Sequence, residues 1–159
     1  MKDTTATGRS PRFLVALVIA VTCALTFAIV PIEDTAAFDD MSVGDLPWGL
    51  ILRYMLTSAL GGLIAGYLLA GLFGRRGAVG WILALIGGGL AMLLAGLLGS
   101  FFGWIPDTFS EAGAPSPLVA VPAGALIPIF AFVGRPILFL VWIAVVLATH
   151  TLSARARQG

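Results

Sequence analysis

Few residues in this chain of 159 are suited to chemistry. It contains one Cys and one His, Cys23 and His150. A structural zinc site needs four ligands and a bis-histidine haem site needs a second His, so neither site is expected. We interpret Cys23 as a small apolar packing residue. His150, between Thr149 and Thr151, is interpreted as an interfacial polar residue near the end of the last apolar segment.

The sequence motifs of common enzyme families are also missing. There is no GxSxG, HExxH, Walker or CxxC pattern. The long apolar segments contain no Asp or Glu, so a carboxylate proton relay within them is not expected. We therefore predict a non-catalytic protein with no cofactor and no metal ion.

Two arginines, Arg53 and Arg135, interrupt otherwise uncharged apolar segments. A charge inside a membrane span costs roughly 2.5–3.5 kcal/mol at the centre and less near an end, so it snorkels or finds a partner. One interpretation is snorkelling to lipid headgroups or pairing with an acid of an outer loop such as Asp45. The alternative is that Arg53 and Arg135 form an anion site for a lipid phosphate or for a carboxylate of a partner.

The composition places these residues in a membrane protein. Hydrophobic residues make up 59% of the chain and charged residues only 11%. Soluble domains carry about 25% charged and 45–50% apolar residues, so a soluble globule is excluded. The net charge of +1 also argues against nucleic-acid binding, which needs a basic surface.

The apolar segments predict an all-α fold, a polytopic bundle with four transmembrane helices in a single membrane domain over 1–159. About 20 apolar residues are needed to cross a bilayer. The expected spans are 13–31, 48–74, 78–102 and 136–152, and the outer loops are 32–47 and 103–117.

Segment 118–134 is apolar but rich in helix breakers. Prolines stand at positions 117, 122 and 128, and Gly134-Arg135-Pro136 closes the segment. Internal prolines kink or interrupt helices, so we expect a kinked extension, a re-entrant half-helix or an interfacial segment. A count of five spans is the alternative.

The positive-inside rule predicts the orientation. With four spans and both termini in the cytoplasm of a bacterial-type inner membrane, the inner side holds seven basic residues and the outer loops hold seven acidic ones. The basic residues are Lys2, Arg9, Arg12, Arg75, Arg76, Arg155 and Arg157. The acidic residues are Glu33, Asp34, Asp39, Asp40, Asp45, Asp107 and Glu111. Five spans would place the basic tail outside.

The first apolar segment has an alternative interpretation as a signal peptide. Thr35-Ala36-Ala37 resembles a small-residue cleavage site. The apolar run is longer than the usual 7–15 residues of a signal sequence, which favours an uncleaved span.

Small residues recur every four positions along the second and third spans. Residues four apart share one helix face, so each span presents a stripe on which another helix can pack closely. We expect the stripes to join the two spans in an antiparallel central hairpin, while a glycine-lined pore or groove is the alternative. The stripe residues are Ser58, Gly62, Gly66, Ala70 and Gly74, then Ala91, Ala95, Gly99 and Gly103.

These observations favour an accessory or scaffolding subunit of a larger inner-membrane complex. Its expected partners are membrane lipids and either other membrane subunits or a second copy of the chain. The alternative is a small transporter, or the membrane subunit of one, with a path lined by segment 118–136, because discontinuous helices often mark binding sites.

Overall fold

The computed structural model describes residues 11–35, 42–109 and 116–157, and its long elements are all α-helices. Each long helix is apolar enough to cross a membrane, with the turn η2 counted as part of α2. The all-α prediction is therefore confirmed. The elements, in chain order, are α1 (Pro11–Thr35), η1 (Val43–Asp45), α2 (Trp48–Leu69), η2 (Ala70–Leu72), α3 (Gly77–Asp107), α4 (Pro117–Gly134) and α5 (Pro136–Ala156).

The expected count of four transmembrane helices is not matched, because segment 117–134 forms a fifth helix that is long and apolar enough to cross a membrane. α4 is continuous over 18 residues although Pro122 and Pro128 lie inside it. Neighbouring helices and small local adjustments can satisfy the backbone groups that a proline releases, so a packed helix tolerates such residues. The chain breaks instead at Arg135, which has φ −138° and ψ 82°, and Pro136 begins α5.

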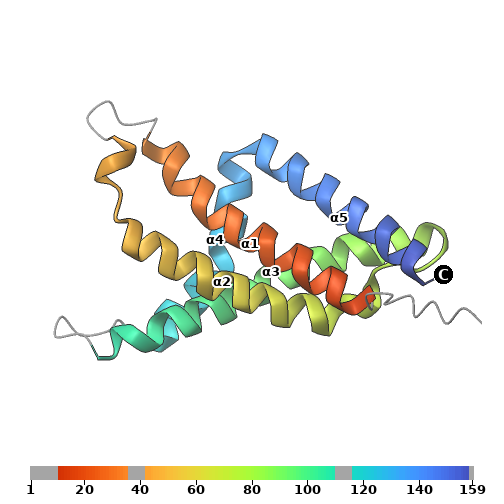
Figure 1. The fold of residues 1–159 in the computed structure, drawn as a ribbon, viewed down its shortest axis with the longest axis horizontal. Helices are drawn as coiled ribbons and strands as arrows, with labels where there is room; N and C mark the ends of the chain where they lie inside the picture. The colour runs from red at the N-terminus through yellow and green to blue at the C-terminus, as the bar shows by residue number, and fades with distance from the viewer. Residues whose placement is uncertain (1–10, 36–41, 110–115, 158–159) are drawn as a thin grey trace, which may run out of the picture.

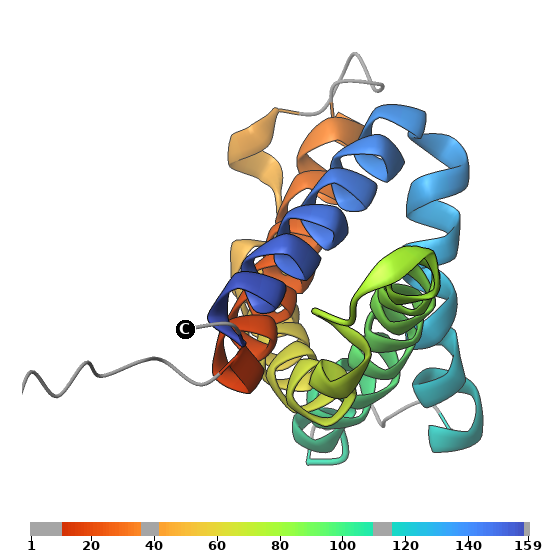
Figure 2. The same cartoon turned by 90° about the vertical axis from the view of Figure 1, so that its right-hand side faces the viewer.

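Consecutive helices from α1 to α4 pack against one another, and α5 lies against both α1 and α3. Figure 1 shows that α1 begins and α5 ends at the same side of the molecule. Figures 1 and 2 show α4 running steeply across α3 rather than alongside it.

The bundle therefore has two distinct ends. We call the end formed by the start of α1, the turn between α2 and α3 and the end of α5 the terminal end. We call the end formed by the end of α1, the start of α2 and the end of α3 the loop end. Arg157, which donates from Nη2 to the Ala70 carbonyl at 3.2 Å, fastens α5 to the turn at the terminal end.

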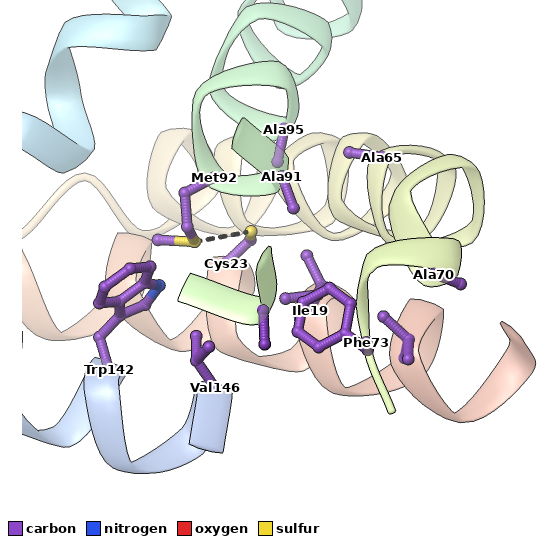
Figure 3. Packing of buried hydrophobic residues seen from close by; sticks show 12 residues of the cluster. Ile19, Cys23, Ala65, Ala70, Phe73, Ala91, Met92, Ala95, Trp142 and Val146 are labelled. Atoms are coloured by element: carbon purple, nitrogen blue, oxygen red, sulfur yellow. Dashed lines mark hydrogen bonds between the residues drawn. The ribbon is translucent and has the colours of Figure 1, made fainter. Parts of the chain in front are cut away.

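Small side chains and a few large ones fill the core. Ala65, Ala84, Ala91 and Phe73 are completely buried. Figure 3 shows Trp142 and Val146 of α5 reaching the same cluster, beside the sulfur atoms of Cys23 and Met92. The helices can approach this closely because much of the interface is alanine and glycine.

Candidate functional site

Arg53 forms an ion pair at the loop end. It lies in the second turn of α2, and its Nη1 atom is 2.7 Å from Oδ1 of Asp107, in the last turn of α3. The Arg53 and Asp107 side chains are 29% and 26% exposed. The guanidinium carbon also lies 5.2 Å from the centre of the Tyr54 ring. The pair joins the start of α2 to the end of α3 at the loop end.

Arg135 forms a second ion pair at the same end. It occupies the junction between α4 and α5, and its Nε atom is 2.7 Å from Oε2 of Glu33 near the end of α1. The Arg135 side chain is 22% exposed, whereas that of Glu33 is 52% exposed. Each of the two arginines therefore meets a carboxylate at the loop end.

The carboxylate named in the sequence prediction, Asp45, has a different partner. Ser42 donates to Asp45 Oδ2 from its hydroxyl at 2.6 Å and from its backbone N–H at 3.0 Å. These hydrogen bonds lower the pKa of Asp45 below its ordinary value because they stabilise the carboxylate. Ser42 is the N-cap of the short turn η1, and Asp45, its third residue, forms a capping box with Ser42.

Arg53 and Arg135 consequently stand beside different carboxylates on different helices. Arg135 also borders a groove between α1 and α5. This groove has a volume of about 460 Å³. Glu33, Gly134 and Arg135 form its polar end, and its apolar walls come from Ile29, Pro136, Ile137, Leu138 and Val141.

The small-residue stripe of α2 does not serve one interface. A Cβ atom on Gly62 would be 2.9 Å from Ala20 Cα, and one on Gly66 would be 2.8 Å from Ala16 Cα, so both glycines face α1. Ser58 faces α3, where a Cβ on Gly99 would lie 2.9 Å from Ser58 Cα. The expected antiparallel contact between α2 and α3 is present, and the α3 stripe serves it, because Ala95, Gly99 and Gly103 meet Gly61, Ser58 and Tyr54 of α2.

The other members of the two stripes lie at the turn after α2, at the α2–α3 contact or in the core. Gly74 has φ +73°, and a Cβ atom on it would be 2.8 Å from the carbonyl carbon of Ser153 in α5. A Cβ on Gly103 would be 2.7 Å from the Tyr54 ring. Ala70, Ala91 and Ala95 are buried in the core.

Sequence reasoning missed the residues that make the closest helix contacts. A Cβ on Gly61 would be 2.6 Å from the Ala95 carbonyl oxygen and 2.9 Å from Gly99 N. On the other side of α3, Gly96 meets the backbone of Gly124 in α4. The sequence feature that could have identified these contacts is the occurrence of small residues in adjacent pairs, at 61–62, 95–96 and 99–100. Adjacent small residues lie on two faces of a helix, so that the helix can pack closely against two others.

His150 is buried at the terminal end rather than exposed at an interface. Its side chain is 3% exposed, and Nδ1 accepts a hydrogen bond of 3.2 Å from the backbone N–H of Gly74. The centres of the Trp81 and His150 rings are 4.5 Å apart. His150 therefore joins α5 to the turn that follows α2.

Cys23 is buried in the core, where its thiol donates to Met92 Sδ at 3.5 Å. Within the described residues, no group of three or more His, Cys, Asp or Glu side chains could hold a metal ion.

Comparisons with known proteins place this chain in no family. No protein-family model, curated protein or solved structure matches it.

Proposed function

We propose that this chain is a non-catalytic, accessory or scaffolding subunit of a larger complex in a bacterial-type inner membrane. The five long apolar helices indicate a multi-pass membrane protein. The observation that carries the subunit proposal is the exposed apolar surface of α4. Only 17% of the 18 residues of α4 are buried inside the bundle. In an apolar stretch of 18 residues of α3, 44% are buried.

The outer face of α4 offers large side chains for contact with another apolar surface. Phe130 is 68% exposed and Val133 is 79% exposed. The opposite face of the same helix packs closely on α3 through Gly124 and Gly96. One face of α4 is thus packed on α3, and the other makes few contacts within this chain, which supports a role of that face in binding a partner subunit.

The distribution of charge supports the proposed orientation, with both termini in the cytoplasm. Among the described residues, the terminal end carries Arg12, Arg75, Arg76, Arg155 and Arg157. The acids Glu33, Asp45 and Asp107 lie at the loop end, where two of them pair with arginines. Basic residues concentrate on the cytoplasmic side of membrane proteins.

We further propose that α1, α2, α3 and α5 cross the membrane and that α4 is an apolar helix that does not cross it. α4 follows the loop end of α3, and Arg135 directly after it pairs with Glu33, again at the loop end. Both ends of α4 therefore belong to the same side of the bundle.

The alternative function, a transporter with a path along 118–136, has less support. The cavity between α1, α3 and α4 beside Pro128 has a volume of about 10 Å³, which is close to the space of one water molecule. Backbone contact between Gly96 and Gly124 fills the α3–α4 interface next to it.

A tagged full-length copy, purified from native membranes in mild detergent and analysed by mass spectrometry, tests the subunit proposal. We expect specific membrane subunits to co-purify, and we expect Phe130→Ala with Val133→Ala to reduce their recovery. Ile82→Ala with Ile86→Ala changes exposed residues of α3 and is the matched control. Recovery of the chain alone, together with solute uptake in liposomes, would support the transporter.

A further inference from the structure

The groove beside Arg135 is larger and more polar than three apolar grooves of the bundle. Its volume of about 460 Å³ exceeds the roughly 190–250 Å³ of the apolar grooves beside Tyr54, Tyr67 and Phe139. One end holds the Glu33–Arg135 ion pair, and the walls are aliphatic side chains of α1 and α5. A groove with charged side chains at one end and apolar walls matches a phospholipid, which has a charged headgroup and apolar acyl chains.

The position of the ion pair fits the depth of lipid headgroups. Glu33 lies in the last turn of α1, and Arg135 directly precedes α5, so both are at the boundary of apolar helices. The Arg135 backbone is held on both sides, because its N–H donates to the Phe132 carbonyl at 3.3 Å and its carbonyl accepts from Phe139 N at 3.2 Å. This junction keeps the guanidinium beside the groove.

The two charges select a class of headgroup. A guanidinium carries five N–H donors and binds phosphate oxygens in a forked geometry, whereas the Glu33 carboxylate only accepts hydrogen bonds. A headgroup with a phosphate and a primary ammonium satisfies both. A choline headgroup has no N–H donor for the carboxylate, and a purely anionic headgroup is repelled by it.

We propose that the groove between α1 and α5 binds an aminophospholipid of the phosphatidylethanolamine type. The phosphate binds Arg135, the ammonium binds Glu33, and one acyl chain lies along Ile29, Ile137 and Val141. Glu33 is 52% exposed and so is accessible to the ammonium. The inference requires only a membrane location and not the proposed role as a subunit.

The Arg53–Asp107 pair is an internal control. It has the same 2.7 Å separation at the same end of the bundle, but Asp107 is half as exposed as Glu33. The nearest described groove, beside Tyr54, is lined by apolar side chains such as Val30 and Leu50 and contains neither charged residue. Loss of this pair should leave lipid selection unchanged.

The test is native mass spectrometry of the full chain with phosphatidylethanolamine, phosphatidylcholine and phosphatidylglycerol of identical acyl chains. We expect phosphatidylethanolamine to be retained about tenfold more than either competitor, the lower end of what one hydrogen bond to a charged group contributes. Glu33→Gln should remove the preference over phosphatidylcholine, and Arg135→Gln should reduce retention of all three lipids. Arg53→Gln with Asp107→Asn should retain the preference.

Equal retention of the three lipids by the unchanged protein would overturn the proposal, as would an unchanged preference in Glu33→Gln. Thermal unfolding of each variant in the same detergent identifies loss of folding, and Arg135→Lys, which keeps the charge, is the second variant if Arg135→Gln unfolds. Co-purification of protein subunits is a separate readout. Loss of co-purification with lipid selection retained would contradict the subunit proposal alone. Loss of lipid selection with co-purification retained would contradict the lipid proposal alone.

Discussion

The backbone N–H of Gly74 and Nδ1 of His150 are joined by a hydrogen bond of 3.2 Å between residues 76 positions apart in the sequence. Gly74 has φ +73°, a left-handed conformation that favours glycine, and the Ser153 backbone fills the space where a Cβ would stand. The only His of the chain thus completes the tight turn between η2 and α3. The contact gives His150 a structural role.

Removing this acceptor should destabilise the bundle. We expect His150→Phe to cost about 1–3 kcal/mol, because the Gly74 N–H would stay buried without a partner. His150→Asn, whose side-chain oxygen can accept the same hydrogen bond, should cost less. Thermal unfolding in detergent measures both, and equal losses for the two variants would show that the acceptor contributes little.

Close packing of α2 on α3 predicts opposite effects for two glycines. Gly61→Ala places a Cβ 2.6 Å from the Ala95 carbonyl oxygen, so we expect a loss of about 1–3 kcal/mol. Gly89→Ala on α3 meets nothing within 4 Å and should gain about 0.5–1 kcal/mol from the higher helix propensity of alanine. Midpoints of thermal unfolding compare them, and a stabilising Gly61→Ala would contradict the packing assigned to α2.

The Arg53–Asp107 pair should stabilise the loop end. Arg53→Gln should cost about 1–2 kcal/mol, because the Asp107 carboxylate loses the positive charge at 2.7 Å in a site only about one quarter exposed. A double-mutant cycle with Asp107→Asn measures the coupling between the two side chains. Additive losses would mean that the 2.7 Å contact adds no stability of its own.

The turn η1 should depend on pH through Asp45. Because the pKa of the Asp45 carboxyl is lowered in the folded protein, its contribution is complete above the ordinary value of 3.8 and is lost as the pH falls through the lower, folded pKa. Titration of this carboxyl by NMR should give a pKa below 3.8, and Ser42→Ala should raise it. An unchanged pKa in Ser42→Ala would show that the Ser42 hydroxyl does not stabilise the charge.

The amino-acid sequence by itself determined the properties that depend on local composition. Long uncharged runs predicted apolar α-helices, because hydropathy and helix length can be measured without a partner. The prolines around 117–136 located the junction at Arg135 correctly, but they did not determine whether the preceding segment stays helical. That outcome depends on packing, since α4 lies with Gly124 against Gly96 of α3.

Tertiary structure alone decided which residues meet. A stripe at intervals of four identifies a helix face but not the neighbour that it contacts, so Gly62 and Gly66 were assigned to α3 although they face α1. The same holds for charge. Glu33 and Asp107, rather than Asp45, reach the two arginines, because the ends of α1 and α3 come together with the start of α2 and the α4–α5 junction only after the helices have packed.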